Sequence, residues 1–244
     1  MNCAAPNRDR GCSVTIRYLY QVLRGLEQQA VFAQILAGFE MARIDSRWVG
    51  FNLVMPEDAL VPMRDFRLHM RMIDYLHVLY PEVRITLHAG ELAEGMVAPE
   101  GLRFHIRESI TRGHASRIGH GTAIAHEDSA EALMRDMAAR RILVEVALSS
   151  SDVILGIKGK NHPLRTYLRY GVPVALATDD EGVARSTLTL EFRKAVQEQG
   201  LDYSTLKRMV RNSIAFSFAE DSVKSRLSGE LEEAFTRFES RRLH

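Results

Sequence analysis

A single pattern recurs along most of the chain: a short apolar run, one or two polar residues, and then a longer amphipathic run. Runs rich in Val, Ile and Leu alternate with segments whose apolar residues fall at helical spacing, which is typical of βα units around a parallel sheet. Six such units can be counted from residue 14 onward. The pattern therefore predicts an α/β protein with extra helices at its C-terminal end.

The same pattern sets the expected bounds of the elements. Strands are expected at residues 14–23, 48–53, 84–87, 117–118, 142–148 and 172–177. Helices are expected near residues 27–42, 63–79, 99–113, 130–137, 163–170, 188–197, 204–217 and 229–241. Residues 1–13 lack an apolar period and are expected to form a disordered or loop-like arm, which leaves residues 14–244 as the folded domain.

Polar residues that follow the apolar runs point to a shared site. The first of them in successive units are Asn52, His88, His120, Ser149 and Asp179, at separations of 36, 32, 29 and 30 residues, about one βα unit each. Parallel strands deliver their carboxyl ends to the same face of a sheet or barrel. We therefore expect these side chains to converge in one pocket.

Imidazoles and carboxylates in one pocket, without a cysteine, suit a metal held by nitrogen and oxygen, most simply Zn²⁺. His88 and Asp179 are the expected metal ligands. Glu91 follows His88 in a glycine-containing turn, where it can act as a general acid or base. His120 offers a second imidazole for orienting or deprotonating water, and Asp180 is free to contact a substrate.

Several of these features also have a plain structural explanation. An Asp-Asp pair at a strand end is often a turn or a helix cap. Glu145 lies inside an apolar run and is interpreted as a partner for a cation, without a catalytic role. The other histidines are expected to be ordinary structural residues: His69, His77, His105, His114, His126, His162 and His244.

Composition excludes two classes of partner. With 32 Lys+Arg against 31 Asp+Glu the formal net charge is +1, so no global field attracts nucleic acid or anionic lipid. No apolar run approaches the ~20 residues of a membrane span, so no membrane partner is expected. Cys3 and Cys12 are expected to be free thiols rather than a disulfide, and the cytoplasm is the default location.

Five motifs stand in the order seen in one enzyme family: ITLHAGE at 85–91, RIGHG at 117–121, LSS at 148–150, HP at 162–163 and TDDEG at 178–182. In them the chain resembles the adenosine deaminases of the metal-dependent amidohydrolase superfamily. NLV at 52–54, PED at 56–58 and residues 182–192 are more similar to the branch related to the adenosine deaminase growth factors. The resemblance extends from about residue 14 to the end.

The resemblance implies a TIM-type (βα)8 barrel and a role for each matching residue. It implies His88 and Asp179 as zinc ligands and Glu91 as the proton shuttle to the purine N1. It further implies His120 as the residue that positions and helps to deprotonate the zinc-bound water, and Asp180 as a contact to the purine ring near N7.

Gly90 is a further expected substrate contact. The implied reaction is the zinc-dependent hydrolytic deamination of adenosine or deoxyadenosine, which gives ammonia and, from adenosine, inosine. Two alternatives stand beside it: a catalytically impaired or inactive truncated member of the family, and a deaminase of another adenine derivative.

The chain departs from the family in three places. The family's first strand carries a His-x-His pair that supplies two zinc ligands, and the sequence contains no His-x-His. Met55 stands where a glycine is usual, and Ser151 where an asparagine is common. Because two of the family's zinc ligands are absent, weak zinc binding is expected. Six units instead of eight predict the last six units of a barrel, with self-association through an exposed barrel edge.

Overall fold

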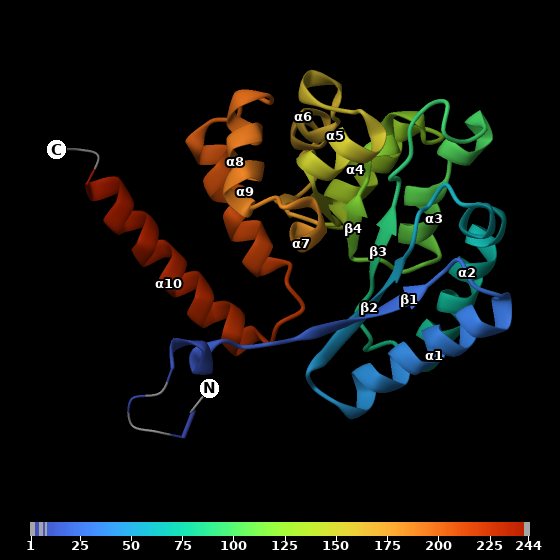
Figure 1. The fold of residues 1–244 in the computed structure, drawn as a ribbon, viewed down its shortest axis with the longest axis horizontal. Helices are drawn as coiled ribbons and strands as arrows, with labels where there is room; N and C mark the ends of the chain where they lie inside the picture. Colours follow the sequence, from blue (N-terminus) through green and yellow to red (C-terminus); the bar gives the residue numbers. More distant parts are fainter. Residues whose placement is uncertain (1–2, 5–6, 8, 242–244) are drawn as a thin grey trace.

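The computed structural model describes residues 3–4, 7 and 9–241 (Figure 1). Within them lie six strands that pair in parallel wherever they pair. Their bounds are β1 Tyr18–Leu23, β2 Trp48–Val54, β3 Thr86–Ala89, β4 Arg117–His120, β5 Leu143–Val146 and β6 Val174–Leu176. The expected six βα units and the α/β fold class are confirmed.

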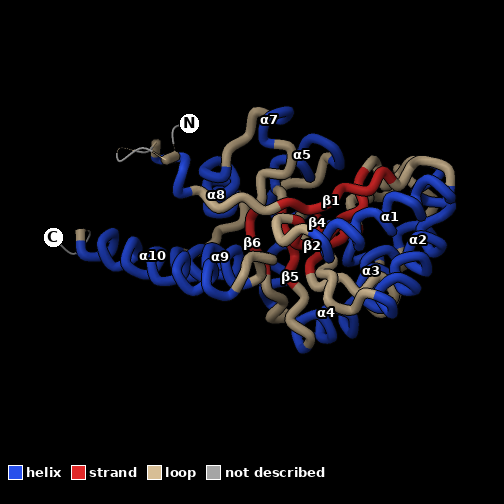
Figure 2. Tube along the Cα trace, turned by 90° about the horizontal axis from the view of Figure 1, so that it is seen from below, coloured by secondary structure: helices blue, strands red, loops and turns tan. Residues whose placement is uncertain are grey.

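Helices surround the strands on their outer side, as Figure 2 shows with strands in red and helices in blue. Those between strands are α1 Gln28–Ile44, α2 Leu60–Leu79, α3 His105–Thr111, α4 Ala130–Ala139, α5 Leu148–Leu155 and α6 Leu164–Arg169. After β6 come α7 Glu181–Ala184, α8 Leu188–Gln197, α9 Tyr203–Ala215 and α10 Asp221–Ser240. Short 3₁₀ helices occupy Arg10–Ser13, Pro99–Leu102, Thr122–His126 and Gly159–Asn161.

The strands form two sheets that meet at a seam. β1 pairs with β2, and β3, β4, β5 and β6 pair in that order. Between β2 and β3 the structure shows a single isolated bridge, Phe51 with Ile85, in place of a continuous ladder. The strand order across the seam is sequential, as expected for consecutive βα units.

One large hydrophobic cluster joins the outer helices to both sheets. Helix α1 contributes Val31, Ile35 and Phe39 at helical spacing, all fully buried. The cluster continues through the strands to Ala195 of α8 and Met209 of α9. The two sheets thus share one core although their ladders are separate.

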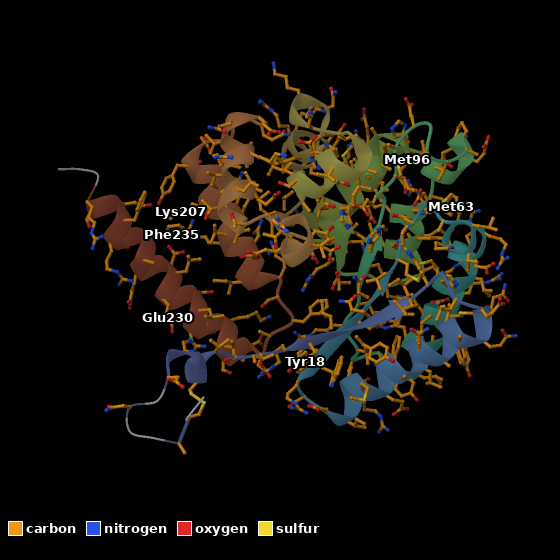
Figure 3. All side chains as sticks on the ribbon, in the orientation of Figure 1. Tyr18, Met63, Met96, Lys207, Glu230 and Phe235 are labelled. Carbon is orange, nitrogen blue, oxygen red and sulfur yellow. A yellow bond between two sulfur atoms is a disulfide. The ribbon has the colours of Figure 1, made fainter. Side chains whose placement is uncertain are left out.

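Helix α10 is attached differently, because none of its described residues is buried. Its contacts with α9 are polar and aromatic: Lys207 pairs with Glu239 at 2.6 Å, and its Nζ lies 4.8 Å from the centre of the Phe235 ring (Figure 3). At its other end, Glu220 pairs with Arg17 of the N-terminal segment at 2.6 Å. Surface ion pairs of this kind contribute little each.

Three expected strands are shorter than the apolar runs indicated, and one of them, β6, spans only Val174–Leu176. β1 begins at Tyr18 rather than at residue 14, because its partner β2 begins only at Trp48, opposite Tyr18. β5 ends at Val146, and Leu148 starts helix α5, which the sequence reading missed. The first backbone N–H groups of α5 are accepted by Glu191, a partner too far along the chain to be inferred locally.

The expectation of free thiols is wrong, because Cys3 and Cys12 form a disulfide. The 3₁₀ helix Arg10–Ser13 turns the chain so that the two Cα atoms lie 5.4 Å apart, within bridging distance. The loop-like arm therefore has local structure where it is described; residues 1–2, 5–6 and 8 lie outside the described residues, as does His244.

Two smaller expectations can be compared directly. Glu145 does pair with a cation, accepting a 2.6 Å hydrogen bond from Arg117 Nε and one of 3.0 Å from Thr86 Oγ1. Within residues 3–4, 7 and 9–241, no helix combines the length and apolar character needed to cross a bilayer.

Candidate functional site

The ends of β3 and β4 bring three of the predicted site residues together. His88 is the last residue but one of β3 and lies beside His120, the last residue of β4, with ring centres 4.5 Å apart. Glu91, in the turn after β3, lies between them: its Oε2 is 3.5 Å from His88 Nε2, and its Oε1 is 3.3 Å from His120 Nδ1. Ligand atoms of these three side chains all lie within 4.8 Å of one another.

Burial sets the charge states in this group. Burial, followed by the positive charge of Arg24, lowers the pKa of His88 to about 4, so its imidazole is neutral at neutral pH. Burial also raises the pKa of Glu91, and the carboxylate of Asp179 acts in the same direction. The site therefore holds a neutral imidazole next to a carboxyl group that retains its proton more readily than an exposed one.

Asp179 and Asp180 follow β6 and are both exposed. Ser150, on α5, links Asp179 to Glu91: its hydroxyl lies 2.8 Å from Asp179 Oδ2 and 3.2 Å from Glu91 Oε1. Asp179 is not part of the close group of His88, Glu91 and His120 but stands one hydroxyl away from it. Asp180 caps the short helix α7 through its backbone carbonyl.

Two adjoining cavities meet at these side chains. One of about 500 Å³ lies along the inner face of the strands, lined by Gln21, Asn52 and Glu145 among others. The other, of about 290 Å³, lies beyond the strand ends, with Met55, Met96 and Ile154 as its apolar wall. Both share Val54, His88, His120, Asp179 and Asp180. The predicted pocket at the carboxyl ends of the strands is thus present.

Gly90, expected to contact substrate, lines neither cavity among the described residues. Its φ of +79° and the 2.8 Å separation that a Cβ would have from Ile106 Cδ1 explain why glycine stands there. Its N–H donates to Glu57 Oε1 at 2.9 Å, and the N–H of Glu91 donates to Glu57 Oε2 at 2.8 Å. A direct substrate contact by Gly90 stays a prediction.

Glu57 is fully buried beneath this turn and is ionised. Burial alone would raise its pKa, but the hydrogen bond from His105, the nearby His88 imidazole and the charge of Arg24 outweigh burial and hold the pKa well below its usual value. His105 Nδ1 lies 2.5 Å from Glu57 Oε1, and His88 Nε2 lies 3.4 Å from Glu57 Oε2. A buried carboxylate thus stands directly behind the predicted site residues.

Arg24 directly follows β1 and is also completely buried. Its guanidinium donates to the His88 carbonyl at 3.0 Å and to the Met55 carbonyl at 3.0 and 3.3 Å. Asn52 Oδ1 accepts the His88 N–H at 2.8 Å. Both backbone groups of His88 are therefore bonded by side chains from the neighbouring sheet.

Three non-glycine residues around the cavities have left-handed backbones: Met55 (φ +92°), His120 (φ +67°) and Asp179 (φ +55°). Such conformations cost of order 1–3 kcal/mol each and cluster at functional sites. Here they follow the strands β2, β4 and β6 at their carboxyl ends, where the cavities lie.

Sequence reasoning missed the part of the site that stands behind the reactive side chains. From the sequence, Glu57 is only part of the PED motif and Arg24 has no predicted role. His105 is predicted to be a structural histidine. The positions of both charged residues could have indicated that they belong to the site. Arg24 directly follows one apolar run, and Glu57 lies just past the end of the next one. His162 has a structural role, as expected: its Nδ1 accepts the N–H of Leu164, the first residue of α6, at 3.1 Å.

Comparison with known proteins identifies the family to which the chain belongs. The family model described as adenosine deaminase matches residues 2–234. The chain belongs to the adenosine deaminase family. The resemblance inferred from the five motifs is thereby confirmed, over almost the whole chain.

Curated members of the adenosine deaminase family match about three fifths of the chain. An adenosine deaminase of Shewanella loihica is 35% identical over 144 residues, covering 59% of this chain and 40% of that protein. The adenosine deaminase of Salmonella typhimurium is 36% identical over 151 residues, covering 62% and 42%. The chain thus spans about two fifths of the length of the curated relatives it matches.

Solved structures of related deaminases match over more of the chain. The N6-methyl-AMP deaminase of Arabidopsis thaliana superposes with a TM-score of 0.69 at 26% identity, covering 89% of this chain and 58% of that one. A zinc-containing amidohydrolase of Burkholderia ambifaria reaches a TM-score of 0.74 at 18% identity over 95% and 60%. The latter likeness concerns the fold alone, which is that of a TIM-type barrel.

The donor set in this adenosine deaminase family member fits a divalent metal. His88 Nε2 and His120 Nδ1 are buried and have no hydrogen-bond partner within the described part of the chain. Such atoms carry a desolvation cost that a bound cation would offset. Neutral imidazole nitrogens combined with carboxylate oxygens are ligands typical of borderline metals, Zn²⁺ among them.

Proposed function

We propose that this chain carries the metal-binding and proton-transfer face of a hydrolase that deaminates an adenine derivative, with adenosine plus water giving inosine plus ammonia as the reference reaction. One observation carries the proposal: the buried Glu91 carboxyl lies between two imidazoles at the junction of the two cavities. A carboxyl group in this situation can deliver a proton to a ring nitrogen of a bound purine.

Glu91 is the proposed general acid. Its raised pKa favours the protonated form, which donates its proton to the purine N1 and makes C6 a better acceptor for the oxygen of water. His120 Nδ1 is the proposed base for that water, because it faces the same space and lacks another partner. The amino group then takes the proton held by His120 as the C6–N bond breaks and leaves as ammonia, while the new C6 hydroxyl returns a proton to Glu91 and becomes the carbonyl oxygen.

Of the side chains described here, His88 Nε2 and an oxygen of Asp179 are the proposed metal ligands, with Glu91 reserved for proton transfer. A metal at this position would polarise a bound water molecule and lower its pKa, which the side chains alone cannot do to the same extent. Asp179 is held toward the group by Ser150. Two protein ligands imply loose binding, since zinc sites with an open position normally have three.

The charge around the mouth favours an uncharged purine compound. The 290 Å³ cavity is lined by Asp58, Glu57, Glu91, Asp179 and Asp180, with no Lys or Arg among its described lining residues. A phosphate group there would face carboxylates at close range. We therefore favour a nucleoside or free base over a nucleotide, although one structural neighbour is named for N6-methyl-AMP.

The test is metal analysis of the purified chain combined with an assay of ammonia release from adenosine, deoxyadenosine, adenine and AMP in the presence of Zn²⁺. We expect turnover of the uncharged compounds and a loss of about 10²- to 10⁴-fold in Glu91→Gln. Glu94→Gln is the matched control, because Glu94 lies three residues on and its side chain is 80% exposed.

Equal rates for wild type and Glu91→Gln would contradict the assigned role. Metal binding without turnover of any of the four compounds would favour the alternative, a catalytically inactive member of the family. Turnover of adenine or AMP alone would show that the substrate is an adenine derivative other than adenosine.

A further inference from the structure

The seam between β2 and β3 is held in an unusual way. After the single bridge between Phe51 and Ile85, no ladder continues among the described residues. Side chains from the β1–β2 sheet bond the backbone of β3 and of its following turn instead, namely Asn52, Arg24 and Glu57. On the side facing β2, the backbone of the predicted site residues is therefore fixed by side chains, whereas on its other side β3 pairs with β4 in a parallel ladder.

Glu57 makes the most of these contacts. Its two carboxylate oxygens accept consecutive N–H groups, those of Gly90 and Glu91, while His105 Nδ1 donates to it from α3. The same carboxylate stands 3.4 Å from His88 Nε2. One buried group thus touches the turn that orients Glu91 and the ring of His88.

Arg24 supplies the compensating charge. It donates to the carbonyl of Met55, just past β2, and to that of His88 near the end of β3, and its positive charge faces Glu57 and Glu91. An ionised carboxylate without such compensation is costly to bury. The two charges together keep the end of β3 in one place relative to β2.

A second buried carboxylate in the same molecule makes a similar pattern without touching the reactive residues. Glu191 of α8 is fully buried and accepts the N–H groups of Leu148 and Ser149 at 2.7 and 3.2 Å. It fixes the start of α5 as Glu57 fixes the turn after β3. It has no contact with His88, Glu91 or His120 in the described structure.

We propose that Glu57 is a positioning residue that holds the Gly90–Glu91 turn and the His88 ring in the arrangement needed for metal binding and proton transfer, with Arg24 as its buried counter-charge. The catalytic meaning of this inference rests on the proposed function; the positioning itself does not. Neither residue needs to touch substrate for the role.

The experiment compares Glu57→Gln with the matched control Glu191→Gln. In Glu57→Gln we expect amide hydrogen exchange at Gly90 and Glu91 to quicken by about tenfold or more, with Leu148 and Ser149 unchanged. Glu191→Gln reverses that pattern. Co²⁺, followed by its visible absorption, reports metal affinity, which we expect to fall about 10- to 100-fold in Glu57→Gln alone.

These readouts need no deaminase activity, so a failure of the proposed function is distinguishable from a failure of this inference. Where ammonia release is measurable, kcat falls in Glu57→Gln and KM for the purine changes little. Unchanged exchange at Gly90 and Glu91 would overturn the inference. So would equal changes in Co²⁺ affinity in the two variants, or none in either, because a purely structural carboxylate would give that result.

Discussion

The two sheets of this molecule share a core but differ in what they contribute to the candidate site. The four-stranded sheet, β3 to β6, carries His88, His120 and Asp179 at strand ends joined by regular parallel ladders. The two-stranded sheet, β1 with β2, carries Arg24 and Asn52, which bond the backbone of its neighbour. Groups with reactive atoms and groups that hold them are thus separated by the seam.

The two sides of the seam also hold buried carboxylates of two kinds. On the two-stranded side, the buried Glu57 has strong donors and a compensating arginine, which lower its pKa. On the other side, the buried Glu127, which follows the 3₁₀ helix after β4, accepts from the described residues only the backbone N–H groups of Ile106 and Arg107, and burial raises its pKa to about 7. Three substitutions test whether the two sides differ as described.

The largest effect is expected from Arg24→Met. This change leaves Glu57 buried without its counter-charge and removes the donors to the carbonyls of Met55 and His88. Breaking a buried charged network in this way costs about 3–5 kcal/mol. The measurement is the free energy of unfolding in urea, with Arg43→Met as control.

Arg43 is an exposed arginine paired with Glu40, and the loss there is expected to stay below about 1 kcal/mol. Similar losses of unfolding free energy in the two variants would mean that Arg24 contributes no more than an arginine in a surface ion pair. The proposed difference between the two sheets would then be wrong.

A smaller effect, dependent on pH, is expected from Glu127→Gln. The folded state keeps the proton of Glu127 up to about pH 7, whereas the unfolded chain releases it near the ordinary pKa of 4.5. The folded state therefore binds more protons between these values, so this group lowers stability as pH rises through that window. At ~1.4 kcal/mol per pH unit the full change is about 3 kcal/mol.

Urea unfolding at pH 5 and pH 8 measures this effect. Wild type is expected to lose stability relative to Glu127→Gln between the two values. Asp128→Asn is the control, because the neighbouring Asp128 has a side chain that is 56% exposed. Parallel pH profiles for wild type and Glu127→Gln would show that the proton is not retained on folding.

The smallest effect is expected from Met55→Gly, and its sign is the unusual feature. Met55 has a φ of +92°, which glycine adopts without strain. Relief of this strain, less the greater chain entropy of glycine, is expected to stabilise the fold by up to about 1 kcal/mol.

Met96 provides the matched control for this change. Met96 and Met55 line the same cavity and are 37% and 36% exposed, but only Met55 has a positive φ. Met96→Gly is therefore expected to be neutral or destabilising in thermal unfolding. A loss of stability in Met55→Gly as large as in Met96→Gly would show that the backbone at Met55 is not strained.

The sequence predicted what depends on local pattern. Helix α8 has the expected bounds, and the strand-end residues meet in one pocket because parallel strands share a direction. Sequence reasoning could not find helix α5, whose first turn depends on Glu191 more than forty residues further on. The roles of Arg24 and Glu57 were hidden for the same reason, since each is defined by atoms of another strand.

The seam has a consequence for how the chain selects one alignment of its strands. In an ordinary parallel ladder, sliding one strand by two residues restores an equivalent set of backbone hydrogen bonds, so the ladder itself distinguishes poorly between alignments. At the β2–β3 seam, Asn52, Arg24 and Glu57 each bond particular backbone atoms, and only one alignment satisfies all three. The residues that hold the site therefore also encode the strand register on which the site depends.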